Sequence, residues 1–123
     1  MNVKLLLLSL LVVSLAACAS KTTRYHWGHY EGIIYNIYEK PGSIDTQTQI
    51  IKLSEDIQQA ESKGKKVPPG VYAHLGMAYA SQGDAASAKA ALLEEKALFP
   101  ASATFIDGIL SRAFNQNKKD TAQ

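Results

Sequence analysis

The sequence predicts an all-α domain of about five helices that follows an N-terminal export signal. Apolar residues recur at helical rather than strand spacing along the chain beyond the first segment. Glycine and proline, which commonly end helices, separate these periodic segments. The first segment differs from the rest, because residues 5–15 form a continuous apolar run that is shorter than the ~20 residues of a permanent membrane span.

The apolar run has the features of a bacterial signal peptide. Lys4 precedes it, and the sequence Leu15-Ala16-Ala17-Cys18 that follows it resembles the lipobox of bacterial lipoproteins. This resemblance implies that residues 1–17 are removed and that Cys18 carries a diacylglyceryl thioether and an N-acyl chain. Two or more acyl chains hold a protein stably on a membrane. Cys18 is the only cysteine, so no disulfide can form within the chain.

The residues after Cys18 predict where the mature protein is sorted. Ala19 in the second mature position resembles the default outer-membrane signal of enteric-type bacteria. We therefore expect a lipid-anchored protein that faces the periplasm from the outer membrane. Residues 18–24 would form a lipidated tether, residues 25–115 the helical domain and residues 116–123 a flexible polar tail.

Local signals place the first two helices. The first is expected within residues 28–40, because Pro41-Gly42 follows a stretch of aromatic and isoleucine residues at helical spacing. Asp45 is the expected N-cap of the second helix, and Gly64 is its expected end. Polar residues of the second helix are expected to face water: Glu55, Asp56, Gln58, Gln59 and Glu61.

Similar signals place the other three helices. Pro69 is predicted as the first residue of the third helix, which ends at Gly83. Asp84 is predicted to cap an alanine-rich fourth helix that ends near Phe99. Ser102 is expected to cap a fifth helix with apolar residues at helical spacing.

The third and fourth helices resemble one tetratricopeptide repeat (TPR), a helical hairpin of about 34 residues. Gly76 and Ala88 occupy small-residue positions, so the two antiparallel helices should pack closely, whereas Glu95 departs from the pattern, which prefers alanine there. The first two helices are interpreted as a hairpin of related shape, and the fifth as a cap of the stack. The other residues that match the repeat, counted with Pro69 as its first position, are Tyr72, Leu75, Tyr79, Gly83, Leu92 and Pro100.

Charge and motifs argue against nucleic-acid binding and catalysis. The net charge is +2, and the basic clusters at residues 63–66 and 118–119 are interpreted as a solvated loop and tail because no aromatic residue interleaves with them. The sequence contains no nucleophile elbow, phosphate-binding glycine loop or zinc-spaced Cys/His set. We expect no enzyme activity and no cofactor other than the covalent lipid.

The titratable clusters have simple interpretations. His26 and His29 could share a helix face, but His74 is the only other histidine, and a metal site needs three or four ligands. Surface or interface histidines are therefore favoured over a metal site. Glu94 and Glu95 are adjacent, point in different directions on a helix and are interpreted as solvated charges.

The aromatic cluster in and just before the first helix, which consists of Tyr25, Trp27, Tyr30, Tyr35 and Tyr38, allows two interpretations. Their rings could pack this helix onto its neighbours, or part of the cluster could be an exposed anchor for a protein partner, because Tyr and Trp dominate interface hot spots. Packing is favoured for Trp27 and Tyr30, and less so for Tyr35 and Tyr38.

A second candidate surface follows from the TPR resemblance. The concave face of such proteins is lined mainly by the first helix of each pair, which here implies Gly70, Ala73, Met77 and Ala80. These residues are small or apolar, and the basic and amide residues that clamp a peptide carboxylate are missing. The resemblance therefore favours an apolar helix or strand as the ligand.

The mature chain also resembles a group of short bacterial outer-membrane lipoproteins. This resemblance rests on residues 25–31, Tyr35, Tyr38, residues 99–102 and Phe105-Ile106. Members of the group are usually encoded beside a lipoprotein similar to the curli secretion channel and a third small lipoprotein. The resemblance implies a component of an envelope lipoprotein assembly and no catalytic residues.

We therefore expect a non-catalytic protein-binding or assembly module whose partners are other envelope lipoproteins, with a protein similar to the curli secretion channel as one candidate. The tether would raise the effective concentration of a partner in the same leaflet. The alternative is a pilotin-like factor that delivers or stabilises an outer-membrane pore subunit. A cell-wall enzyme would need a cleft with a perturbed carboxylate, for which the sequence offers no candidate.

Overall fold

The computed structural model describes residue 3 and residues 23–120, with side chains up to residue 114. Apart from Val3, the predicted signal peptide therefore lies outside the described residues, as do Cys18, most of the tether and the last three residues. The all-α prediction is confirmed, since no strand occurs within residues 23–120. The elements of this part are α2 (Tyr30–Glu39), α3 (Thr46–Ser62), α4 (Val71–Ser81), α5 (Ala85–Leu98), the short 3-10 helix η1 (Pro100–Ser102) and α6 (Ala103–Asp120).

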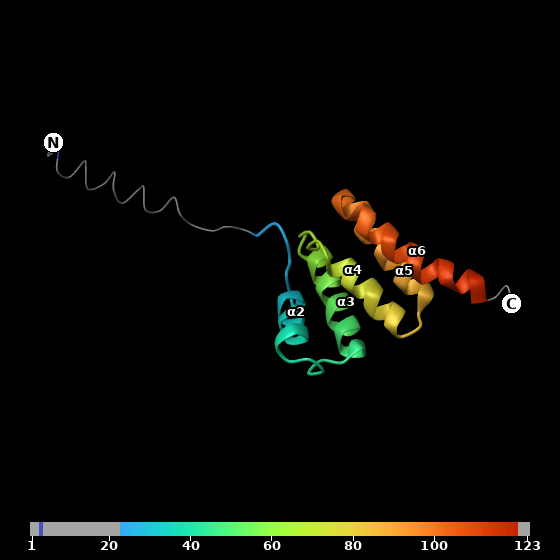
Figure 1. The fold of residues 1–123 in the computed structure, drawn as a ribbon. Helices are drawn as coiled ribbons and strands as arrows, with labels where there is room; N and C mark the ends of the chain where they lie inside the picture. Colours follow the sequence, from blue (N-terminus) through green and yellow to red (C-terminus); the bar gives the residue numbers. More distant parts are fainter. Residues whose placement is uncertain (1–2, 4–22, 121–123) are drawn as a thin grey trace.

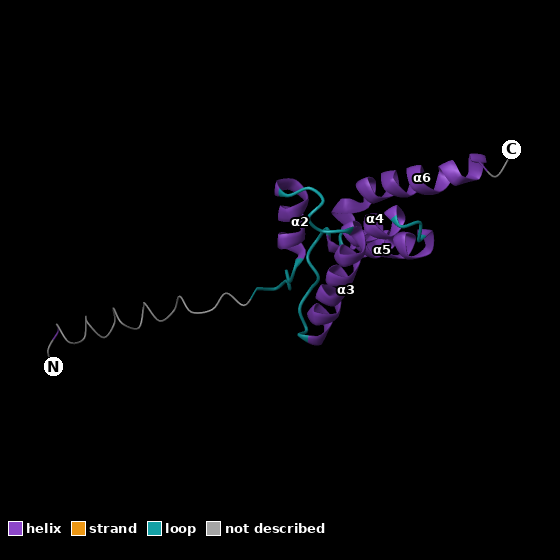
Figure 2. Ribbon diagram, turned by 90° about the horizontal axis from the view of Figure 1, so that it is seen from below, coloured by secondary structure: helices purple, strands orange, loops and turns teal. Residues whose placement is uncertain are grey.

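The helices stack as antiparallel hairpins in chain order. Helix α2 packs on α3, α3 on α4, α4 on α5 and α5 on α6. Figure 1 shows the α4–α5 hairpin between the α2–α3 hairpin on one side and α6 on the other, and Figure 2 gives the same order from below. This is the TPR-like arrangement that the spacing predicts, with α6 closing the end of the stack. No helix of the described part combines the length and the apolar character needed to cross a bilayer.

Glycine lets the two helices of the central hairpin come close together. A Cβ atom on Gly76 would lie 2.7 Å from Cγ of Leu92 and 3.0 Å from the backbone oxygen of Ala88, both distances shorter than normal van der Waals contact. Ala88 and Leu92 are buried at this crossing. The expected close approach at Gly76 and Ala88 is therefore confirmed.

Two of the predicted N-caps are confirmed, and the predicted start of the third helix is wrong. Asp45 accepts a hydrogen bond from Thr48 N at the start of α3, and Asp84 accepts one from Ser87 N at the start of α5. Helix α4 begins at Val71 rather than Pro69, with Gly70 as its N-cap at φ +95°. The left-handed conformation of Gly70, which a residue with a side chain rarely adopts, turns the chain into the helix only after the two prolines.

The start of α4 depends on a buried carboxylate from the neighbouring helix. Glu95 on α5 is 1% exposed, so the interpretation of it as a solvated charge is wrong. Its Oε1 accepts a hydrogen bond from Gly70 N at 2.8 Å, and its Oε2 accepts one from Ala73 N at 3.3 Å. A carboxylate that accepts the free N–H groups at a helix N-terminus is stabilised by those bonds and by the helix dipole.

The first hairpin uses the same arrangement. Asp56 on α3 is 2% exposed rather than facing water as expected. One oxygen of Asp56 accepts a hydrogen bond from His29 N at 2.7 Å, where α2 begins, and the other lies 2.8 Å from Nδ1 of the His29 ring. In each hairpin, therefore, a buried acid on the second helix caps the first helix. This shared feature supports the interpretation of α2–α3 as a hairpin of related shape.

The first described residues run beside the loop between α3 and α4. His26 N donates to the backbone oxygen of Lys66 at 2.9 Å, and Lys66 N donates to the backbone oxygen of Arg24 at 3.0 Å. Tyr25 and Lys66 thus form an isolated parallel bridge. At the other end of the chain, α6 continues to Asp120, so most of the predicted tail at residues 116–123 continues this helix.

Candidate binding groove

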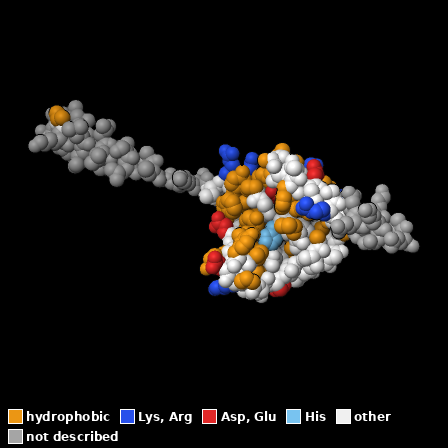
Figure 3. Space-filling view, viewed as in Figure 1, with side chains coloured by type: hydrophobic (Ala, Val, Ile, Leu, Met, Phe, Trp, Pro, Cys, Tyr) orange, Lys and Arg blue, Asp and Glu red, His pale blue; other side chains and the backbone are white. Residues whose placement is uncertain are grey.

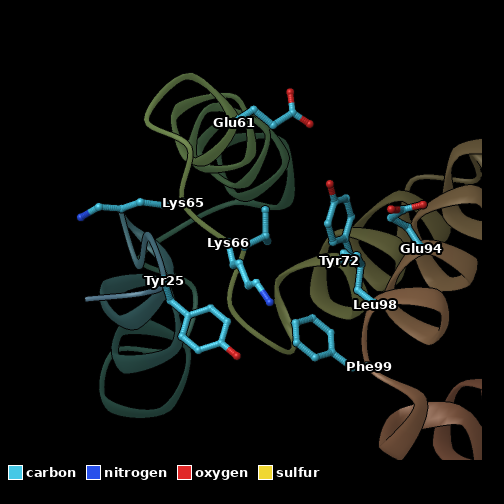
Figure 4. A pocket seen from close by; sticks show the side chains of 9 residues that line it. Tyr25, Glu61, Lys65, Lys66, Tyr72, Glu94, Leu98 and Phe99 are labelled. Atoms are coloured by element: carbon cyan, nitrogen blue, oxygen red, sulfur yellow. The ribbon is translucent and has the colours of Figure 1, made fainter. Parts of the chain in front are cut away.

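A cavity of about 450 Å³ lies at the end of the domain where residues 23–26 pass the loop between α3 and α4. Figure 4 shows the rings of Tyr25, Tyr72 and Phe99 around this cavity, with the Lys66 side chain extending between them and Lys65 extending away. The cavity is formed by the first described segment, the end of α3, the loop that follows it, α4 and α5. Its lining residues are Tyr25, Glu61, Lys65, Lys66, Val67, Tyr72, Glu94, Leu98 and Phe99.

A second cavity of about 490 Å³ continues the first along the helices. The two adjoin at Glu61, Tyr72 and Glu94, which line both, so together they form one shallow groove over α4 between α5 and the end of α3. Its other lining residues are Leu75, Tyr79, Ser87, Ala90 and Ala91. The α4 residues lie three or four positions apart, and so do most of the α5 residues, so each set occupies one face of its helix. We call the joined cavities the α3–α5 groove.

The centre of the α3–α5 groove is aromatic and its edge is charged. Glu61 and Glu94 are exposed on opposite walls beside Tyr72. The pKa of the Tyr72 hydroxyl is raised by burial, and further by the negative charges of Glu94 and Glu61. Tyr72 therefore stays neutral and keeps a proton to donate. Around Tyr72 the groove offers apolar contact, a hydroxyl donor and two carboxylates, which suits a peptide segment with apolar and cationic residues, while Lys65 and Lys66 line its other end beside Tyr25.

The predicted aromatic anchors do not form one site. Trp27 is 38% exposed and packs edge-on against Tyr25, with ring centroids 6.2 Å apart, so it lies next to the groove. Tyr35 and Tyr38 are exposed on α2, and neither lines the groove. Tyr30 is half-buried and packs against Ile33, Val71 and other core residues, as the packing interpretation expects.

The predicted concave surface is only partly open. Met77 and Ala80 are exposed on α4, but Ala73 is 7% exposed and packs with Leu92 and Ile106. Ala73 is therefore part of the core and cannot contact a partner while α6 is in place. Figure 3 shows hydrophobic side chains gathered over α2 and α4 on the face that this view presents, so an apolar surface remains there.

Sequence reasoning missed most of the α3–α5 groove. From the sequence alone, Tyr72 is assigned only to the repeat pattern, Glu94 is interpreted as a solvated charge, and Lys65 and Lys66 as part of a solvated loop. One signal was present, because Tyr72, Leu75 and Tyr79 share a face of the third helix. The contribution of Tyr25 depends on its backbone bridge to Lys66, which joins segments far apart in the sequence.

His74 is half-buried on α4 and does not line the groove. Its Nε2 lies 2.8 Å from Oε1 of Gln49, and its ring packs edge-on against Tyr30. Burial lowers the pKa of His74 below its ordinary value of 6.5. The imidazole of His74 therefore binds a proton more readily in the unfolded chain than in the folded chain. As the pH falls below about 6.5, this difference lowers the free energy of unfolding.

Replacement of His74 should therefore reduce the loss of stability that occurs as the pH falls. We expect the Tm of His74→Gln to fall less than that of the unaltered chain between pH 7.5 and pH 5. Thermal unfolding followed by circular dichroism at several pH values measures the difference. Equal pH slopes for the two chains would show that His74 is not the group responsible.

The described residues contain no group of three or more His, Cys, Asp or Glu side chains placed to hold a metal ion.

Comparison with known proteins gives one family. The family model described as "Domain of unknown function (DUF4810)" matches residues 24–109, which is more than half of the chain. No curated protein and no solved structure matches the chain. The matched range takes in α2 to α5 and the first part of α6, together with the α3–α5 groove, and the chain belongs to this DUF4810 family.

Proposed function

We propose that the chain is an outer-membrane lipoprotein that faces the periplasm and binds a peptide segment of another envelope lipoprotein as a non-catalytic assembly module. The single observation that carries the binding role is the α3–α5 groove, which combines an aromatic centre with acidic walls. The lipobox-like sequence that ends at Cys18 supports the anchor. A partner in the same leaflet would meet the groove at high effective concentration, so a modest affinity would suffice.

The side chains that line the groove favour peptide binding over catalysis. Its titratable side chains are two exposed glutamates on opposite walls, two lysines and three tyrosines. Peptide recognition on helical surfaces uses apolar side chains for contact and a few charges for register. A partner segment with apolar residues and a lysine or arginine would complement Tyr72 and its two glutamates.

Crosslinked affinity purification from outer membranes tests both parts of the proposal. We expect the unaltered chain to capture a defined set of lipoproteins, and Cys18→Ser to lose them together with its outer-membrane location. The groove variant is Glu61→Lys/Glu94→Lys, which reverses both wall charges at exposed positions. Its matched control is Glu39→Lys/Glu55→Lys, which reverses two exposed glutamates outside the groove.

The groove variant should lower partner recovery about tenfold or more, since a like charge in place of an opposite one at an interface costs over ~1.4 kcal/mol. Equal recovery with the groove variant and its control would overturn the role of the α3–α5 groove. Capture of nothing by an unaltered chain present in the outer membrane would overturn the assembly role. A captured pore subunit that is mislocalised when the chain is deleted would favour the pilotin-like alternative.

A further inference from the structure

Four basic side chains, those of Arg24, Lys63, Lys65 and Lys66, lie at one end of the domain, near the start of the segment from residue 23. The backbone bridge between Tyr25 and Lys66 places Arg24 beside the loop after α3, which carries Lys63, Lys65 and Lys66. All four side chains are exposed. Figure 3 shows Lys and Arg side chains gathered at this end, next to the start of the described chain. We call this surface, together with Tyr25 and Trp27, the basic end.

No cation of the basic end forms an ion pair within the described part of the chain, and Lys63 Nζ donates to the neutral Oε1 of Gln59 at 3.0 Å. The ion pairs in this part join His29 to Asp56 and Lys96 to Asp107, so neither uses a cation of the basic end. Glu61 lies on the same side of the domain but lines the groove, into which Lys66 also extends. Arg24, Lys63 and Lys65 therefore present positive charge to a partner outside the chain, although the net charge of the whole chain is only +2.

The basic end is also aromatic. Trp27 is exposed and packs edge-on against the half-buried Tyr25. Trp and Tyr are enriched where proteins meet the headgroup level of a bilayer, because their rings are apolar at one end and polar at the other. Clustered lysine and arginine near a membrane are attracted to anionic headgroups within about one Debye length, ~8 Å at physiological salt. The combination matches an anionic lipid surface.

The position of the anchor indicates which surface the basic end would meet. Tyr25 is seven residues after Cys18, a distance that an extended chain spans in no more than about 25 Å. A lipid on Cys18 would therefore keep the basic end close to the headgroups. This step rests on the lipid anchor in the proposed function.

We propose that the basic end docks on the anionic surface of the bilayer that holds the anchor and thereby orients the domain. The α3–α5 groove then opens beside the membrane, because Tyr25 and Lys66 belong to both surfaces. The segment that the groove binds is accordingly a membrane-proximal part of the partner, next to the partner's own lipid attachment or membrane-inserted region.

Trp27, the only tryptophan of the chain, reports docking directly. The lipoprotein is purified from membranes in detergent and reconstituted into phosphatidylcholine vesicles with or without phosphatidylglycerol. With phosphatidylglycerol present, we expect a blue shift of the Trp27 emission and quenching by lipids brominated near the headgroup. Without it, or in high salt, the shift and the quenching should be lost.

Matched lysine variants test whether the basic end is responsible. Lys63→Gln/Lys65→Gln/Lys66→Gln should lose the phosphatidylglycerol-dependent shift, whereas Lys40→Gln/Lys52→Gln/Lys89→Gln, which removes the same charge elsewhere, should keep it. The proposal is overturned if emission is the same in both lipid mixtures, or if the two triple variants behave alike. Circular dichroism verifies that both variants are folded.

The mass of the same purified protein separates this proposal from the anchor on which it rests. An acylated chain whose Trp27 does not respond to phosphatidylglycerol overturns membrane docking and leaves the proposed function standing. A chain without acyl groups on Cys18 overturns the lipid anchor, and the docking proposal falls with it. An acylated chain with the expected Trp27 response supports both.

Discussion

Glu95→Ala should lower the free energy of unfolding by about 3 kcal/mol, because it removes the acceptor of two N–H groups at the start of α4. The half-buried Gly70 N and the buried Ala73 N both donate to this carboxylate, which is itself 1% exposed. The loss of a charged acceptor at the N-terminus of α4 adds to the cost, since the helix dipole favours a negative charge there. For a domain of this size, we expect the Tm to fall by about 10–20 °C.

The neighbouring residue supplies the control for this experiment. Glu94 is exposed, so Glu94→Ala should change the stability by no more than about 0.5 kcal/mol. Glu95→Gln keeps one acceptor oxygen but turns an NH2 group toward an N–H donor, so its stability should lie between those of Glu95→Ala and the unaltered chain. Urea unfolding measures all four proteins. Equal losses for Glu94→Ala and Glu95→Ala would contradict the capping role.

Asp56→Ala should lower the free energy of unfolding by about 2 kcal/mol and loosen α2 in particular. The substitution removes the acceptor of His29 N and the contact with the His29 ring, which together fasten the start of α2 to α3. The cost should be smaller than at Glu95, because His29 is exposed and water can reach part of the site. Global stability by urea unfolding and amide hydrogen exchange along residues 29–33 separate the two effects.

Glu55→Ala is the matched control, since Glu55 is exposed and adjacent on the same helix. It should leave both the unfolding free energy and the exchange of the α2 amides close to those of the unaltered chain. If Asp56→Ala lowers global stability without faster exchange at the start of α2, then Asp56 stabilises the core in some other way. Asp56→Asn, with one acceptor oxygen left, should have an intermediate effect.

Periodicity and capping signals predicted the helices well, since these signals act over a few residues. Asp45 and Asp84 each cap their own helix three residues along the chain, so the pattern is visible in a short window of sequence. The spacing of Gly76 and Ala88 likewise predicted the close crossing of α4 and α5. In each case the residue types and their spacing along the sequence were enough to predict the contact.

The two buried acids could not be predicted in the same way. A carboxylate in an amphipathic helix is assigned to the water-facing side unless a partner is known, and the partners of Asp56 and Glu95 lie on other helices. Glu95 carried one warning, because it replaces the alanine that the TPR pattern prefers. The α3–α5 groove was missed for a related reason, since its walls come from segments that only the tertiary fold brings together.

The backbone bridge between Tyr25 and Lys66 determines how a mechanical load would enter the domain. A pull on the chain before Arg24 reaches the hydrogen bonds of His26 N and Lys66 N before it reaches α2. The force therefore passes to the loop behind α3, and α2 remains outside the load path until both bonds break. A protein held through its N-terminal segment could then yield at this bridge and close it again while its hairpins stay folded.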